Sequence, residues 1–244
     1  MTRSVVSFPQ KFGEGVACRS EICIKPDDCE PGPCSIARCP ILHDVGRTAQ
    51  FKADETLFWE GDRADHVYLV VDGIVRTCRF FADGRRQIVR FAFPGDLMAN
   101  TNTESYRCTA EAVTPLTVLA LPRSAFNEQI EGLACLRRLV TDKILSELDE
   151  RRSQVLLLGR MNAAERVAQF LVMLADHGDG EPADPIELPM SRADMADYLG
   201  LTVETVSRVL SRFKREGKIR MPSQNTIIPA ALDLAIEARQ AVAA

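Results

Sequence analysis

Hydrophobic and polar positions follow a helical period twice within residues 189–220. Met195 and Leu199 recur at helical spacing behind Ser191, a residue type that caps helices, and Asp194 stands three positions after that cap. This arrangement predicts one short helix that begins after Ser191.

A second apolar stripe begins after Gly200, which breaks the first pattern, and Thr202, which can cap a new helix. Its members recur at a period of about 3.6 residues, and they are Val203, Val206, Val209, Leu210 and Phe213. Two short helices joined by a glycine turn predict a helix-turn-helix. In that motif the second helix places its N-terminal residues on base edges in the major groove.

Positive charge is concentrated in residues 203–220, although the whole chain carries a formal net charge of -4. A local basic face suits contacts with phosphates, although a solvated amphipathic helix would carry similar charges. Glu204, Ser207 and Arg208 lie at i, i+3 and i+4, so they share one polar face near the start of the second helix. Arginine suits guanine, glutamate suits cytosine, and serine serves several bases. The basic residues are Arg208, Arg212, Lys214, Arg215, Lys218 and Arg220.

Between residues 47 and 122 the pattern changes to short apolar runs, which are HVYLVV, GIVRTC, QIVRFAF and LTVLAL. Turn signals such as Asp72-Gly73 and Asp83-Gly84 separate these runs. Regular turns between short apolar runs are typical of a β-sandwich or barrel.

The apolar period is helical again from residue 124 to residue 158, and no proline or glycine follows Gly132 in this stretch. We therefore predict one long amphipathic helix. Dimers of helix-turn-helix proteins bind two half-sites, so we assign the helix to a parallel pair in a homodimer; packing on its own domain is the alternative. The predicted interface residues are Val140, Ile144, Glu147, Leu148, Arg151 and Val155.

Arg151 interrupts the apolar stripe with a charge. Identical charges near a two-fold axis face one another and destabilise a dimer unless each has an opposite partner. Glu147 and Glu150 are candidate partners, and we predict that the pairing of Arg151 with Glu147 makes the dimer less dependent on a bound metal cluster. An exposed helix charge with no role in the dimer is the alternative.

The remaining segments complete an α+β chain. RMNAAERVAQFLVMLADHG is predicted to be a helix packed inside the DNA-binding domain, and residues 221–229 are predicted to form its wing, with TIIP as the second strand. The predicted division is a Cys-rich segment (1–46), a β domain (47–123), a dimerisation helix (124–158), a winged helix-turn-helix (159–229) and a helical tail (230–244).

Composition narrows the class of protein further. The chain has 244 residues, and none of its apolar runs approaches the roughly 18 residues of a membrane span. The N-terminus lacks the apolar region of a signal peptide, which predicts a cytoplasmic protein without a membrane partner. Three scattered histidines, with no nucleophile motif and no phosphate-binding glycine loop, argue against an enzyme.

Cysteines are concentrated near the N-terminus, and without an export signal they indicate metal or redox chemistry. Prolines interleaved with them exclude a long helix, and a loop of closely spaced thiolates can hold a soft metal or an iron–sulfur cluster. Zinc is one alternative, but it is only weakly supported because the cysteines form no C-x2-C pair. Spare thiols in a tail are another alternative. These cysteines are Cys18, Cys23, Cys29, Cys34 and Cys39.

The run ADYLGLTVETVSR resembles the CRP/FNR family of bacterial transcription regulators, and its E-x-x-S-R signature resembles the FNR branch, which includes FixK-type regulators. The resemblance covers nearly the whole chain and implies a jelly-roll sensor ahead of the dimerisation helix. It implies that the homodimer binds double-stranded DNA with TTGAT-like half-sites and recruits RNA polymerase. Nitrogen fixation, microaerobic respiration and denitrification are the regulons it suggests. The predicted DNA contacts are Ser191, Arg192, Thr202, Glu204, Thr205, Ser207, Arg208, Arg212 and Lys214.

The resemblance also bears on ligands. In the FNR branch, three N-terminal cysteines and one from the sensor domain hold an oxygen-labile [4Fe–4S] cluster. By similarity Cys29, Cys34 and Cys39 supply three ligands. The fourth stays open between Cys108 and a further loop cysteine, Cys23 or Cys18. A FixK-like chain without a cluster, controlled by abundance or by cysteine oxidation, is the alternative.

Members of the family that bind cyclic nucleotides use a Gly-Glu pair and an Arg-Ser pair. This chain has MANTNTESYRC at the corresponding turn, where Arg107 is followed by Cys108. No cyclic nucleotide is therefore expected.

Overall fold

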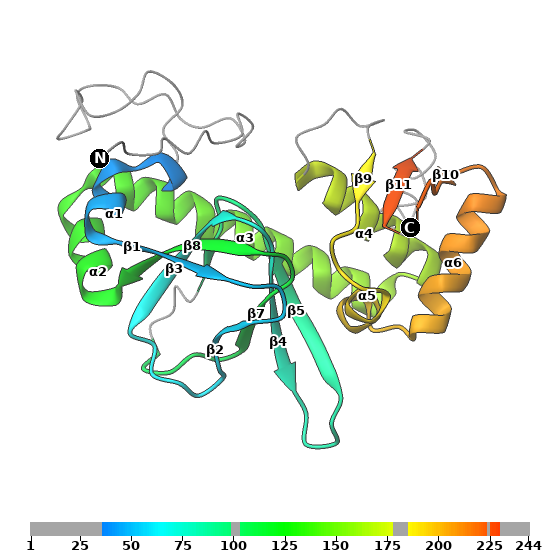
Figure 1. Ribbon diagram of the computed structural model, residues 1–244, viewed down its shortest axis with the longest axis horizontal. Coiled ribbons are helices and arrows are strands. Elements are labelled where there is room, and N and C mark those ends of the chain that lie inside the picture. The colour runs from blue at the N-terminus through cyan, green and yellow to red at the C-terminus, as the bar shows by residue number, and fades with distance from the viewer. Residues whose placement is uncertain (1–35, 99–102, 178–184, 224, 230–244) are drawn as a thin grey trace.

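The computed structural model describes residues 36–98, 103–177, 185–223 and 225–229, and it has the predicted α+β architecture (Figure 1). A β domain formed by residues 47–122 is followed by a long helix that leads to a helix-turn-helix domain formed by residues 163–229. Most of the predicted cysteine loop and the predicted helical tail lie outside the described residues. No described helix is both long and apolar enough to cross a bilayer.

The β domain consists of two four-stranded antiparallel sheets. Val70 and Val118 from one sheet and Val75 and Ala92 from the other are fully buried in a common cluster, so the sheets pack face to face. The first sheet has the order β1 (Arg47–Phe51), β8 (Leu116–Pro122), β3 (His66–Asp72) and β6 (Leu97–Met98). The second has the order β2 (Thr56–Phe58), β7 (Thr109–Ala112), β4 (Val75–Phe80) and β5 (Arg86–Ala92).

The four predicted apolar runs form β3, β4, β5 and β8, which confirms that part of the prediction. Both faces of β3 are buried, since Val67 and Leu69 lie in the core beneath the helices whereas Val70 lies in the core between the two sheets. The turn between β3 and β4 requires Gly73, whose φ is +87° and whose Cβ, if present, would collide with the carbonyl oxygen of Pro115.

The outer face of the first sheet is covered by helices (Figure 1). Leu69 and Leu121 pack there against Phe126 and Leu136. The helices are α1 (Pro40–Val45), α2 (Arg123–Gly132) and α3 (Ala134–Arg160), and a 3-10 turn, η2 (Ile36–Arg38), precedes α1.

The prediction of one continuous helix over residues 124–158 was wrong, because the structure has two helices separated at Leu133. Leu133 is extended (φ -121°, ψ 107°), and its side chain is buried in the same core as Phe126. Arg137 donates to the last carbonyls of α2, from Nη2 to Glu131 O at 2.5 Å and from Nε to Ile130 O at 3.3 Å. Burial of Leu133 and capping by Arg137 therefore favour the break over a continued helix.

The helix-turn-helix domain contains α4 (Ala163–His177), α5 (Arg192–Leu199) and α6 (Val203–Arg215). A small antiparallel sheet borders them in the order β10 (Ile219–Arg220), β11 (Thr226–Pro229) and β9 (Ile186–Glu187), and its central strand β11 is the predicted wing strand TIIP. Their shared core includes Phe170, Leu199 and Phe213, and it also contains Ile88 and Phe91 from β5 of the β domain. The two domains are therefore joined by apolar packing as well as by α3.

Candidate DNA-binding interface

Local hydrogen bonds fix the start of α5 and the turn after it. Ser191 and Asp194 form the predicted capping box, because Ser191 Oγ accepts from Asp194 N at 3.0 Å while the Asp194 carboxylate accepts from Ser191 N at 3.2 Å. Gly200 is left-handed (φ 62°, ψ 40°) and ends α5. Thr202 Oγ1 then accepts from Thr205 N at 3.1 Å and starts α6, so both predicted caps are confirmed.

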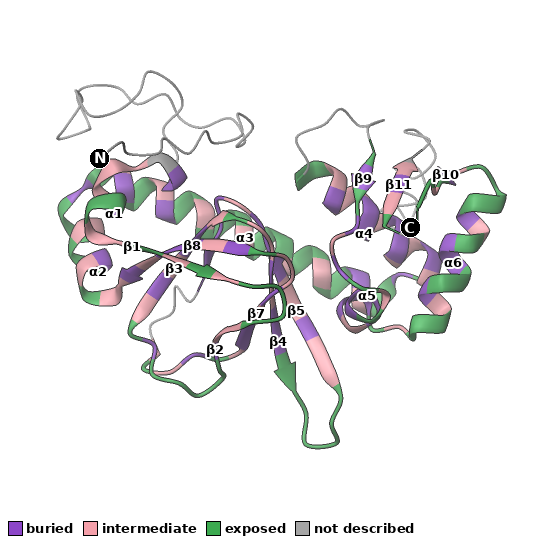
Figure 2. Ribbon diagram, viewed as in Figure 1, coloured by how far each residue is buried: buried purple, intermediate pink, exposed green. Residues whose placement is uncertain are grey.

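One face of α6 is buried and holds the helix in the domain (Figure 2). Val206, Val209, Leu210 and Phe213 all lie in the core. Val203 was predicted in the same stripe but is 46% exposed, since it opens the helix at the edge of the domain. The packing fixes the rotation of α6 and turns its other face to solvent.

The exposed face carries Glu204, Ser207 and Arg208, as predicted. Arg208 Nη2 lies 3.3 Å from Thr205 Oγ1, and Arg208 Nε lies 3.9 Å from Glu204 Oε1. Both members of this ion pair are largely exposed, so water and salt weaken it and each side chain is available to a partner.

The other predicted contacts differ in their surroundings. Lys214 is exposed near the end of α6, whereas Arg212 is half-buried, with its guanidinium 5.6 Å from the centre of the Phe213 ring. Arg192 Nη1 lies 3.2 Å from Met195 Sδ, and burial lowers the pKa of Arg192. Since the hydroxyls of Ser191, Thr202 and Thr205 are engaged at helix starts, the most open predicted contacts lie on α6.

Two sequence models of known domains match the chain in the same order as these structural domains. The cyclic nucleotide-binding domain matches residues 48–132, and the Crp-like helix-turn-helix domain matches residues 165–234. The nitrogen fixation regulation protein FixK of Bradyrhizobium diazoefficiens is 39% identical over 180 residues, which cover 72% of this chain and 75% of FixK. The chain belongs to the CRP/FNR family of transcriptional regulators.

Other relatives place this regulator in the FNR/FixK branch of the family. The transcriptional activator protein FnrL of Cereibacter sphaeroides is 33% identical over 201 residues, covering 80% of this chain and 81% of FnrL. The solved structure of FixK2 from Bradyrhizobium japonicum aligns with a TM-score of 0.73 and 35% identity over 78% of this chain and 96% of that one. The α5–α6 unit of this regulator is therefore a DNA-binding helix-turn-helix.

The predicted metal ligands of this regulator are only partly within the described residues, because Cys23, Cys29 and Cys34 lie outside them. Cys39 is half-buried at the start of α1 and packs on the same core as Cys135 in the first turn of α3. Within the described ranges no group of three or more metal-binding side chains is found.

Cys108, the predicted fourth ligand from the β domain, has different surroundings. It is half-buried before β7, where the charged groups near it include Arg151 and Glu60. Burial raises the pKa of the Cys108 thiol, which disfavours the thiolate that a metal requires.

The predicted dimer residues of α3 divide between two faces. Ile144, Leu148 and Val155 are exposed, at 49%, 45% and 71%, and form an apolar stripe. Val140 was also predicted at the dimer interface. The structure buries it in the core of its own chain with Leu136, so its side chain is not available to a second copy.

The predicted pair of Arg151 and Glu147 is present, with Arg151 Nη2 3.1 Å from Glu147 Oε1. Arg151 Nη1 also donates to Val89 O at 2.6 Å, and Glu147 accepts a second ion pair from Arg90 at 3.1 Å. Both charges are therefore compensated by groups of the same chain.

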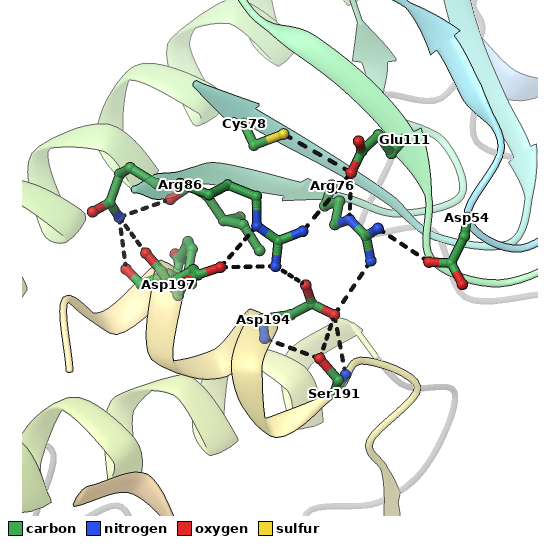
Figure 3. A network of polar contacts seen from close by, with 11 residues as sticks. Asp54, Arg76, Cys78, Arg86, Glu111, Ser191, Asp194 and Asp197 are labelled. Atoms are coloured by element: carbon green, nitrogen blue, oxygen red, sulfur yellow. Dashed lines mark hydrogen bonds and ion pairs between the residues drawn. The ribbon is translucent and has the colours of Figure 1, made fainter. Parts of the chain in front are cut away.

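Sequence reasoning missed the residues that join the β domain to α5, namely Arg76, Arg86 and Asp197 (Figure 3). Burial alone would lower the pKa of Arg86, but the carboxylates of Asp197 and Asp194 outweigh burial and raise it. One signal was available: Asp194 and Asp197 lie at i and i+3 on a helix of a DNA-binding motif, where phosphates would repel them. Such a pair predicts cationic partners inside the protein.

Proposed function

We propose that this regulator binds TTGAT-like palindromes as a homodimer and activates genes of anaerobic or microaerobic metabolism by recruiting RNA polymerase. The observation that carries the proposal is the exposed face of α6, where Glu204, Ser207 and Arg208 stand together on a helix fixed by its caps and its buried side. The half-site sequence follows from the resemblance of the E-x-x-S-R motif to the FNR branch. Two relatives are named nitrogen fixation regulation protein FixK, which supports nitrogen fixation genes as targets.

The homodimer in this proposal is built on the exposed stripe of α3. Two copies paired along α3 would present two α6 helices, and a two-fold site requires them about 34 Å apart, one turn of the duplex. Ile144, Leu148 and Val155 are the side chains that such a pair would cover.

Arg208→Ala is expected to weaken binding to the palindrome by about 1–3 kcal/mol and to relax the preference at one base pair of each half-site, because a guanidinium that reads guanine carries sequence information. Fluorescence anisotropy with duplexes altered at single positions measures both effects. Lys214→Ala is the matched variant, since an exposed phosphate contact should weaken all sequences similarly. Equal loss on palindromic and random DNA for Arg208→Ala would count against the assignment.

We further propose that a [4Fe–4S] cluster regulates this activity, with Cys29, Cys34 and Cys39 among its ligands. Thiolates are the donors that such clusters require. Cys39 could link such a cluster to the start of α3, because it packs on the same core as Cys135 and Leu136 of that helix. When bound, the cluster supplies an oxygen-labile link among the N-terminal cysteines. An ordered Cys39 would then hold the start of α3 in the arrangement in which the paired copies bind DNA, while the pairing itself depends on the exposed stripe of α3.

Anaerobic purification should yield a coloured protein with about four irons per chain that loses its visible absorption and its palindrome binding together in air. Iron and sulfide analysis, absorption spectra and anisotropy before and after air measure this. Cys39→Ser should remove the colour, whereas Cys108→Ser should retain it.

A colourless protein that binds equally well in air would instead support a FixK-like regulator controlled by its abundance. Air-induced loss of binding that a thiol reductant reverses would indicate control by cysteine oxidation. Zinc in place of iron would identify a structural metal site.

A further inference from the structure

Strands β4 and β5 of the β domain contact the first helix of the helix-turn-helix through a network of charged side chains (Figure 3). Arg86 on β5 donates from Nε to Asp197 Oδ2 at 2.8 Å and from Nη2 to Asp194 Oδ1 at 2.6 Å. One guanidinium thus bridges two carboxylates one turn apart on α5, a geometry that lysine could not reproduce.

Arg76 on the neighbouring strand β4 strengthens the same connection. Its Nη1 lies 3.3 Å from Asp194 Oδ2, while its Nε and Nη2 bind Glu111 at 2.8 Å and Asp54 at 3.0 Å within the β domain. The Asp194 and Arg76 side chains are only 4% and 11% exposed, so water weakens this contact far less than it weakens the pairs on α6.

The backbone of α5 is held as well. Gln87 Nε2 donates to Asp197 O at 2.5 Å and lies 3.5 Å from Tyr198 O, near the end of α5. We call Arg76, Arg86, Gln87, Asp194 and Asp197 the interdomain network. It contacts α5 at its capping residue and again near its C-terminal end, which fixes both the position and the direction of the helix.

The interdomain network contacts α5, whereas the exposed face of α6 with Glu204, Ser207 and Arg208, called the reading face, lies on the next helix. Met195 and Leu199 of α5 share a core with Val206 and Leu210 of α6, so α6 follows any displacement of α5. The exposed face with Glu204, Ser207 and Arg208 remains open to solvent in this arrangement. The network therefore holds the helix-turn-helix in a position that leaves its reading face accessible.

We propose that Arg76 and Arg86 are positioning residues for DNA recognition, which hold α5, and through it α6, at the orientation that a two-fold site demands. This inference rests on the proposed function. A dimer gains affinity from its second half-site only when both reading helices are held at the correct spacing and angle. Without the guanidinium groups, the buried carboxylate of Asp194 has lost its cationic partners and the domain contact is weakened.

Arg86→Ala tests the proposal by anisotropy on two duplexes, the full palindrome and a single half-site. We expect palindrome affinity to fall by about 5- to 150-fold, the range of typical coupling between sites. Half-site affinity should stay close to that of the original protein, because α6 itself is unchanged. Arg85→Ala is the matched control: Arg85 lies one residue before β5, is largely exposed and pairs with Asp83, so both affinities should be unchanged.

Two further measurements separate positioning from damage to the fold. Asp197→Asn removes only the half-exposed end of the network and should give a smaller loss with an unchanged thermal unfolding midpoint. The double variant with Arg86→Ala should lose less than the two single losses combined, because both act on one contact.

Three outcomes would overturn the inference. Unchanged palindrome binding by Arg86→Ala and Asp197→Asn would show that the interdomain network has no role in DNA binding. Tighter binding would show that the network holds the helix-turn-helix domain in a position that opposes DNA binding. Equal losses on palindrome and half-site would indicate damage to α6 itself. If the original protein does not prefer the palindrome to random DNA, the proposed function fails instead, so the two failures are distinguishable.

Discussion

Truncation of Phe213 to alanine is expected to destabilise the helix-turn-helix domain by about 3–5 kcal/mol, the usual cost of removing a buried aromatic ring. Phe213 is fully buried where α6 packs on the core of the domain. Arg212 and Lys218 lie over its ring, at 5.6 Å and 5.5 Å from the centroid. The truncation therefore removes both the packing of the core and the surface on which these two cations rest.

Urea unfolding followed by far-UV circular dichroism measures this loss, since the domain is rich in helix. The single tryptophan, Trp59, lies in the β domain and reports separately on that part of the chain. Val203→Ala on the same helix is the control, because its side chain is half-exposed and should cost little. An unchanged unfolding midpoint for Phe213→Ala would contradict the packing described for α6.

The parts of the site that the sequence predicted correctly depend on neighbours in the chain. The caps at Ser191 and Thr202 and the left-handed turn at Gly200 are decided by residues within four positions, so their chemistry is visible in one short stretch. The buried face of α6 follows from periodicity for the same reason. Its first residue, Val203, was misplaced because the edge of the domain cannot be seen in the period.

The parts that were missed depend on contacts between distant segments. Arg86 and Asp197 are 111 residues apart in the chain, and no local pattern pairs them. The break between α2 and α3 arises because the Leu133 side chain is buried in the core of the β domain, and Val140 is buried in the same core. Strand β6 has only two residues, too few to show an alternation.

Leu148→Glu is expected to convert the dimer to a monomer at micromolar concentration and to weaken palindrome binding by roughly 10²–10⁴-fold, the gain that a second linked half-site supplies. Leu148 lies mid-way along the exposed stripe, between Ile144 and Val155. By symmetry a pair of α3 helices places two copies of position 148 close together. Two desolvated carboxylates would then replace an apolar contact between the two α3 helices, and no cation of the apolar stripe would compensate their charge.

Sedimentation of both proteins, purified in air and free of metal, measures the change. The original protein should sediment as a dimer even without a cluster, because Glu147 and Val89 O of the same chain compensate the charge of Arg151 before the helices meet. Ser153→Glu is the matched control: it adds the same charge to α3 at an exposed position away from the stripe and should leave the dimer intact. A metal-free original protein that sediments only as a monomer would show that compensation within one chain is not enough. A dimeric Leu148→Glu protein would show that the copies pair through another surface.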